Sequence, residues 1–166
     1  MDIDSILVPE RTICSLRASS KKRAFELAAK HINRSVPQLE TGDVYRGLIE
    51  REKLGSTAVG DGIAIPHCRL EGCDSITGSL FVLEDPIDFL AHDDEPVSIM
   101  FVLLVPASET TEHLATLGML AERFQIEGYR KDLIAAKDNA ELYKRALSAT
   151  TPPINSLSND AFAYCH

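Results

Sequence analysis

The sequence has no apolar stretch long enough to cross a bilayer. Its most apolar run, Val97 to Val105, is about half the ~18–20 residues that a membrane helix needs. The first four residues, Met1-Asp2-Ile3-Asp4, offer neither the basic segment nor the apolar segment of a secretory signal. We therefore expect a cytoplasmic protein with no membrane insertion.

The chain also has fewer positively than negatively charged residues. The chain has 17 Lys and Arg against 25 Asp and Glu, which gives a formal net charge of −8. Nucleic-acid binding needs clustered Lys and Arg to neutralise phosphates, so this balance argues against a general nucleic-acid partner. The negative charge instead favours the steering of protein partners that carry basic patches.

Motifs for disulfides and metals are missing as well. None of the four cysteines (Cys14, Cys68, Cys73 and Cys165) forms a C-x-x-C pair, and a reducing cytosol disfavours disulfides. There is no H-E-x-x-H motif. His67, Cys68 and Cys73 are weak candidates for zinc ligands. His67 and Cys68 are adjacent, and adjacent side chains on a strand point to opposite faces. We expect no metal and no cofactor.

The sequence predicts a single α/β domain. The 166 residues have an ordinary globular composition, with 45% hydrophobic and 25% charged residues. Short apolar segments predict strands at 12–16 and 78–83, and the nearly continuous apolar run 97–105 is typical of a strand buried on both faces. Helical spacing predicts helices at about 21–33, 44–51, 114–124, 129–136 and 139–147. Helices before and after the strands favour a three-layer sandwich with a central mixed β-sheet and helices on both faces. Residues 151–166 lack periodicity and are expected to form a disordered tail.

A glycine-rich segment leads from Leu54 towards a short apolar run. It lacks the Lys-Ser/Thr of a nucleotide loop, with Asp61-Gly62 in its place, and Ile65 breaks the dinucleotide fingerprint. Such a loop can still offer N–H groups and hydroxyls to a lone phosphoryl group. The residues expected to do so are Gly55, Ser56, Thr57, Gly60 and Gly62.

Two histidines stand where chemistry is plausible. His67 follows Pro66 at the end of the apolar run, and it is either a reactive imidazole or a half-buried histidine at a strand end. His113 falls in the first turn of a predicted helix, where partial positive charge favours a neutral ring and welcomes an anion. The alternative for His113 is a simple residue at a helix start. The others are expected on a helix surface, in an acidic turn and at the chain end: His31, His92 and His166.

The segment from Arg51 to His67, REKLGSTAVGDGIAIPH, resembles the signature of the type-2 enzyme IIA domain of the bacterial phosphotransferase system, the mannitol/fructose class. Leu104-Val-Pro followed by His113-Leu resembles a second segment of that family. The resemblance covers about residues 5–147. The standalone chain and the stretch SSKKRAFE from Ser19 are most similar to the nitrogen-related branch, which regulates rather than imports sugar.

The resemblance implies a set of roles. His67 matches the histidine phosphorylated on Nε2 by an HPr-like phosphocarrier, Arg51 matches an arginine that pairs with the phosphoryl group, and His113 matches the second active-site histidine. Cys68 departs from the family pattern, in which a small residue such as glycine is common. The family fold is a mixed sheet between helices.

Three functions are therefore in view. The first is a phosphorylated regulator of nitrogen- and potassium-linked metabolism, with potassium transport or sensor-kinase components among its targets. The second is a sugar-specific enzyme IIA that passes phosphate to an enzyme IIB. The third is an interaction module whose histidine is unused or serves only as a switch.

Overall fold

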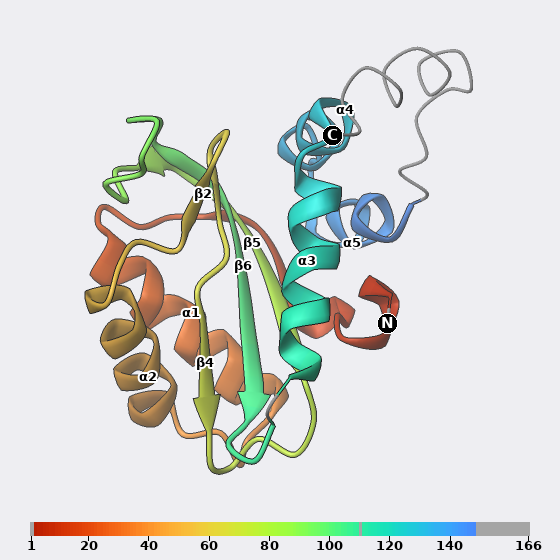
Figure 1. The fold of residues 1–166 in the computed structure, drawn as a ribbon. Coiled ribbons are helices and arrows are strands. Elements are labelled where there is room, and N and C mark those ends of the chain that lie inside the picture. Colours follow the sequence, from red (N-terminus) through yellow and green to blue (C-terminus); the bar gives the residue numbers. More distant parts are fainter. Residues whose placement is uncertain (1, 110, 149–166) are drawn as a thin grey trace.

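The computed structural model describes residues 2–109 and 111–148 (Figure 1). Within these ranges the chain forms one six-stranded sheet and five α-helices. The strands are β1 (Thr12–Leu16), β2 (Ala58–Gly60), β3 (Ile63–Ala64), β4 (His67–Leu70), β5 (Thr77–Ile87) and β6 (Val97–Pro106). The helices are α1 (Lys21–Ser35), α2 (Thr41–Lys53), α3 (Glu112–Phe124), α4 (Glu127–Ile134) and α5 (Asn139–Leu147), and short 3₁₀ turns occupy Ile3–Ser5 and Pro9–Arg11.

The sheet is mixed, as predicted. Its strand order is β1-β5-β6-β3-β2, and β4 also pairs with β6. β5 and β6 are antiparallel, whereas β1 runs parallel to β5, and both β3 and β4 run parallel to β6. β6 therefore lies between β5 on one side and the β3 and β4 pair on the other. Its near-continuous apolar sequence is explained by burial on both faces.

Helices cover both faces of the sheet, with α1 and α2 on one side and α3, α4 and α5 on the other (Figure 1). Alternate residues of β6 pack into the two hydrophobic cores on opposite faces of the sheet, because side chains alternate along a strand. Met100 and Leu104 pack with Phe25 of α1, whereas Phe101 packs in the second core with Phe124 of α3. The predicted three-layer sandwich is confirmed.

Local sequence signals account for two helix starts. Ser20 caps α1, since its hydroxyl accepts a hydrogen bond from the backbone N–H of Arg23 at 3.1 Å. Asp138 caps α5 through the N–H of Glu141 at 2.8 Å, and the Glu141 carboxylate reaches back to the N–H of Lys137 at 3.0 Å. This reciprocal arrangement is close to a capping box.

Several boundaries differ from the sequence prediction, and three of the differences have a clear physical reason. β5 continues beyond residue 83 to Ile87. The prediction ended too early because residues 84–86 are exposed and show no apolar alternation. α4 spans 127–134 rather than 129–136, since apolar spacing marks its buried face (Tyr129 and Leu133) and not its ends. His67 begins β4 instead of ending a strand. The run breaks at Pro66, which has no N–H and whose carbonyl accepts from Leu103 at 2.9 Å.

None of the helices in the two described ranges combines the length and the apolar character needed to cross a membrane. The predicted disordered tail, residues 151–166, lies outside the described residues.

Candidate functional site

A hollow of about 470 Å³ opens between α2 and α3, above β4 and β6. Three of its lining residues are the ones singled out in the sequence: Arg51 in the last turn of α2, His67 at the start of β4, and His113 in the first turn of α3. The structure therefore brings together residues from three separate elements. Its other lining residues include Leu54, Cys68 and Leu103.

The ring of His67 is oriented by the backbone two residues earlier. Nδ1 lies 2.8 Å from the carbonyl oxygen of Ile65. A carbonyl oxygen only accepts hydrogen bonds, so the proton of a neutral ring belongs on Nδ1. Nε2, on the opposite side of the ring, then keeps its lone pair. This partner of Nδ1 was not visible in the sequence, because any residue can supply a backbone carbonyl.

The surroundings of His67 favour its neutral form. Burial lowers the pKa of His67 below its usual 6.5, and the charges of Arg51 and His113 lower it further. The hydrogen bond to Ile65 and the carboxylate of Glu52 act in the opposite direction on this pKa, but the net shift is downward. At neutral pH the imidazole is therefore available as a nucleophile.

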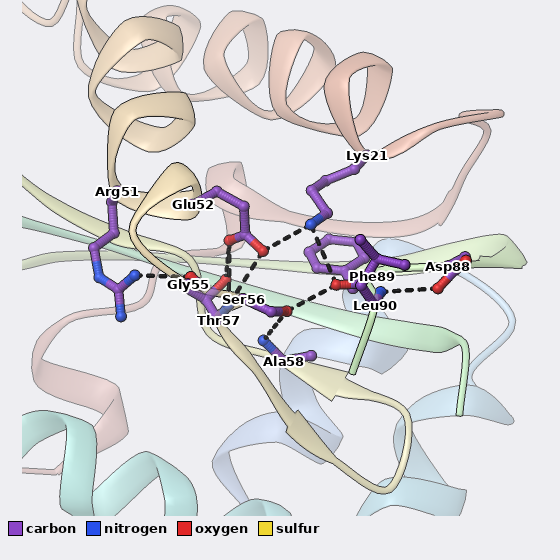
Figure 2. A network of polar contacts seen from close by, with 10 residues as sticks. All are labelled: Lys21, Arg51, Glu52, Gly55, Ser56, Thr57, Ala58, Asp88, Phe89 and Leu90. Carbon is purple, nitrogen blue, oxygen red and sulfur yellow. Dashed lines mark hydrogen bonds and ion pairs between the residues drawn. The ribbon is translucent and has the colours of Figure 1, made fainter. Parts of the chain in front are cut away.

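Arg51 is half-buried and already makes one fixed contact. Its Nη1 donates to the carbonyl oxygen of Gly55 at 2.9 Å (Figure 2). A guanidinium carries five N–H donors in a planar fork, so this single bond leaves others for a second group.

His113 is the second residue of α3 and lies in its first turn. The N-cap residue, Thr111, makes no side-chain capping bond, although the carboxylate of Glu109 accepts from the N–H of Glu112 at 2.7 Å. Nδ1 of His113 is buried and bonds to no described residue. Unlike His67, His113 therefore has no described backbone partner that fixes its tautomer.

The first part of the glycine-rich segment uses its polar groups inside the protein. The backbone N–H and the hydroxyl of Thr57 both donate to Glu52, and the hydroxyl of Ser56 donates to the carbonyl oxygen of Phe89 at 2.8 Å (Figure 2). The carbonyl of Gly55 accepts from Arg51. These donors are occupied, so they are not free to cradle a phosphoryl group.

The second part shapes the turn between β2 and β3. Gly60 and Gly62 have φ values of 98° and 78°, which favour glycine. The carbonyl of Gly62 accepts from Ser98 and Ile99 of β6. None of the five predicted loop residues, Gly55, Ser56, Thr57, Gly60 and Gly62, lines the hollow. In this structure the segment therefore lies behind the hollow, and a role for these residues in holding a phosphoryl group stays a prediction.

Cys68 fits the site because α2 has a glycine opposite it. A Cβ atom on Gly47 would lie 2.8 Å from the Cys68 sulfur, which is too close without movement. Burial raises the pKa of the Cys68 thiol to about 12, so the thiol stays protonated. Sequence reasoning missed Gly47, although a glycine inside a helical pattern was an available signal.

In the described part of the chain, no three His, Cys, Asp or Glu side chains gather as metal ligands. The thiol of Cys73, considered above as a zinc ligand with His67 and Cys68, donates instead to the carbonyl oxygen of Ser75 at 3.1 Å.

Residues 5–148 match the model of the family described as "Phosphoenolpyruvate-dependent sugar phosphotransferase system, EIIA 2". The chain belongs to this family. It is 41% identical over 142 residues to the nitrogen regulatory protein of Pseudomonas aeruginosa, covering 86% of this chain and 92% of that protein. Over 149 residues it is 42% identical to the nitrogen regulatory protein of Escherichia coli K12, covering 87% and 88% of the two chains.

Solved structures agree. The crystal structure of nitrogen regulatory protein IIA-Ntr from Neisseria meningitidis superposes with a TM-score of 0.80 at 38% identity, over 87% of this chain and 98% of that one. IIA mannitol from Escherichia coli has a TM-score of 0.69 at 20% identity, over 84% and 98%, and shows a shared fold. The predicted resemblance to the type-2 enzyme IIA family, and within it to nitrogen regulatory proteins, is confirmed.

Proposed function

We propose that His67 accepts a phosphoryl group on Nε2 from the phosphohistidine of a small HPr-like carrier of the nitrogen branch. The observation that supports this most directly is the bond from Nδ1 to the Ile65 carbonyl. It leaves Nε2 with its lone pair in a ring that lines an open hollow. The lowered pKa of His67 keeps that lone pair unprotonated at neutral pH.

The transfer is balanced without a co-reactant. The lone pair of His67 Nε2 forms a bond to phosphorus as the bond between phosphorus and the carrier's imidazole nitrogen breaks. The carrier's ring leaves with that electron pair, so one histidine is phosphorylated and the other released. Such reactions ask the protein chiefly for alignment and for stabilisation of charge on the phosphoryl oxygens.

Arg51 and His113 supply the charge stabilisation in this proposal. Arg51 offers the N–H groups of its guanidinium that do not bond Gly55, in a fork that suits two phosphoryl oxygens. His113 offers a ring N–H at the start of α3. Both residues line the hollow beside His67.

The rim of the hollow suits a transient protein partner. Leu54 and Leu114 are 84% and 60% exposed, and they follow Arg51 by three residues and His113 by one. Transient contacts of this kind bury little surface, under roughly 1,200 Å² in total. The carrier must bring its own histidine to His67, and exposed apolar side chains beside the hollow give that contact surface to bury.

Phosphorylation then acts as the signal. A phosphohistidine adds negative charge and strong acceptor oxygens to the surface, which creates or destroys partner contacts. We propose that in the cytoplasm this state controls nitrogen- and potassium-linked targets, with potassium transport or sensor-kinase components among them. The support is that relatives sharing 41% and 42% identity are nitrogen regulatory proteins.

The decisive experiment uses enzyme I, the carrier and labelled phosphoenolpyruvate. We expect the wild-type chain to gain an acid-labile, alkali-stable label, and His67→Ala to gain none. His92→Ala is the matched control, because His92 is exposed and does not line the hollow. Labelling of His67→Ala at the wild-type rate contradicts the assignment, and an unlabelled wild-type chain leaves the interaction module as the better account.

The sugar-specific enzyme IIA is the second candidate. The matched family is described as a sugar phosphotransferase family, and the mannitol enzyme IIA, solved in complex with phosphorylated enzyme IIB, shares this fold with a TM-score of 0.69. Complementation of fructose or mannitol uptake in a strain lacking its own enzyme IIA tests this candidate. Restored uptake favours it over the regulatory function.

A further inference from the structure

A buried carboxylate lies directly behind Arg51. The side chain of Glu52 is 6% exposed and accepts from three donors: Lys21 Nζ at 2.9 Å, the N–H of Thr57 at 3.1 Å and the hydroxyl of Thr57 at 2.6 Å (Figure 2). We call the two bonds between Glu52 and Thr57 the clamp. They close the chain after α2 into a small loop of residues 53–56.

The clamp fixes the carbonyl that holds Arg51. Gly55 lies inside the closed loop, and its carbonyl oxygen accepts from Arg51 Nη1 at 2.9 Å. On an open loop this contact would restrain little, because an arginine side chain has many rotamers and one bond to a moving acceptor does not order it. With the loop closed, the acceptor is stationary and the guanidinium is held in one orientation at the wall of the hollow.

The same clamp reaches the segment that carries His67. The carbonyl of Thr57 accepts from the N–H of Ile65 at 3.0 Å, and the carbonyl of Ile65 bonds His67 Nδ1 at 2.8 Å. Thr57 thus belongs to two chains of hydrogen bonds, one that leads through the closed loop to Arg51 (the arginine branch) and one that leads through Ile65 to His67 (the histidine branch).

Lys21 anchors the carboxylate from a third element. Its ammonium also donates to the carbonyl oxygen of Phe89 at 3.2 Å and lies 4.9 Å from the centre of the Phe89 ring. Buried ion pairs roughly break even against apolar side chains in folding stability, so stability alone does not account for a charge pair in this place. Holding a neighbouring group in a fixed orientation does account for it.

We propose that Glu52 and Thr57 are positioning residues that hold the Arg51 guanidinium ready for the phosphoryl group. The proposal rests on the proposed transfer to His67. Neither residue lines the hollow, so both act through Arg51 and the backbone.

Thr57→Val is the sharpest variant. Valine keeps the shape of threonine and the backbone bond from Ile65, but it lacks the hydroxyl, so it loosens the arginine branch alone. We expect transfer from the pre-phosphorylated carrier to slow about fivefold to tenfold, because a guanidinium on a looser loop is less often aligned with the phosphoryl group. Thr57→Ser restores the hydroxyl and should recover most of the rate.

A double-mutant cycle separates positioning from general weakening. In an Arg51→Ala background, Thr57→Val should slow transfer by less than about twofold, because the residue on which it acts is gone. Glu52→Gln is a second way to open the clamp and is used if the valine variant melts early. Glu84→Gln is its matched control: the Arg17–Glu84 pair is exposed, and its loss should leave the transfer rate unchanged.

A readout without phosphate separates this proposal from the proposed function. In the free protein, NMR should show slow rotation of the Arg51 guanidinium in the wild type and fast rotation in Thr57→Val. Equal guanidinium rotation in the two proteins, a wild-type transfer rate in Thr57→Val, or equal slowing in both backgrounds overturns the positioning role. A wild-type chain that accepts no phosphoryl group refutes the proposed function, while the NMR comparison still decides whether the clamp orients Arg51.

Discussion

The two walls of the hollow are built differently. On the α2 wall Arg51 is bonded to the Gly55 carbonyl, and buried Glu52 closes the loop behind it. On the α3 wall the helix starts without a side-chain cap from Thr111, and Nδ1 of His113 bonds to no described residue. The α2 wall therefore makes its polar contacts before any ligand arrives, whereas the α3 wall has contacts still to make. We expect preorganised charge to come from α2 and adjustment to a partner to come from α3.

The largest expected difference between the walls is in phosphoryl transfer. Arg51→Ala removes a charged, oriented donor, and His113→Ala removes a neutral one. Contacts of these kinds are worth about 1.5–3 and about 0.5–1.5 kcal/mol respectively. Arg51→Ala should therefore slow transfer by about 10- to 150-fold and His113→Ala by about 2- to 10-fold. Rates from the pre-phosphorylated carrier measure both.

Two further variants sharpen this test. Arg51→Lys should recover part of the loss only, because a point charge does not reproduce a fork of donors. Arg46→Ala is the control on the same helix: Arg46 is exposed, pairs with Asp43 and does not line the hollow. A wild-type rate in Arg51→Ala would mean that Arg51 is only a residue at a helix end. A larger loss in His113→Ala would reverse the comparison of the walls.

Folding stability should also distinguish the walls. Glu52→Gln weakens the bonds to Lys21 and Thr57 in a buried place, and we expect the free energy of unfolding to fall by about 1–3 kcal/mol. Thr111→Ala removes a side chain that makes no capping bond, so its effect should be a small fraction of that. Asp138→Ala, which removes a cap bond that is made, should cost about 1 kcal/mol and calibrates the scale.

Denaturant unfolding of the three variants supplies the measurement. Equal losses from Glu52→Gln and Thr111→Ala would show that the α3 wall is as firmly held as the α2 wall.

Much of this architecture was predictable from the sequence. The near-continuous apolar run along Val97–Pro106 and the helical spacing on either side were enough to predict a mixed sheet between helices, because burial patterns are local properties. The first and last residues of the signature, Arg51 and His67, both line the hollow. His113 was predictable as a residue of the first turn of α3.

The rest depends on contacts between segments far apart in the chain. Lys21 and Glu52 are 31 residues apart, and no pattern in either segment indicates that they pair. The glycines suggested a cradle, but whether Thr57 donates to a ligand or to Glu52 is decided by the buried carboxylate nearby. The closeness of Gly47 to Cys68 likewise follows from how α2 packs on β4.

That closeness gives a smaller prediction about the α2 wall. Gly47→Ala gains helix propensity, worth about 0.5–1 kcal/mol, but its Cβ would meet the Cys68 sulfur at 2.8 Å. We expect the free energy of unfolding to fall by about 1 kcal/mol net, since overpacking typically costs about 1–3 kcal/mol. In a Cys68→Gly background the same change should be neutral or stabilising. A loss of the same size in both backgrounds would show that Leu70, whose Cδ2 would lie 3.2 Å from the new Cβ, is the limiting neighbour.

The smallest expected effect is a shift in the titration of His67. Burial is the main reason that its pKa lies below 6.5, and the charge of Arg51 adds more to the lowering than that of His113. Both Arg51→Ala and His113→Ala should therefore raise the pKa of His67 towards 6.5, Arg51→Ala by more. Proton NMR of the imidazole signals across pH 4–8 measures the shift.

The sign of the effect on stability follows from the same shift. The unfolded chain binds a proton at His67 with a pKa near 6.5, and the folded protein binds it less readily. The contribution of His67 to stability is thus fully present above pH 6.5 and is lost as the pH falls through the lower, folded pKa. Transfer should follow the same window, because only the neutral ring attacks phosphorus. If His113→Ala raises the pKa of His67 more than Arg51→Ala does, His113 is the stronger electrostatic neighbour of His67. The α3 wall would then supply more of the charge at the site than the α2 wall, the reverse of what their hydrogen bonds indicate.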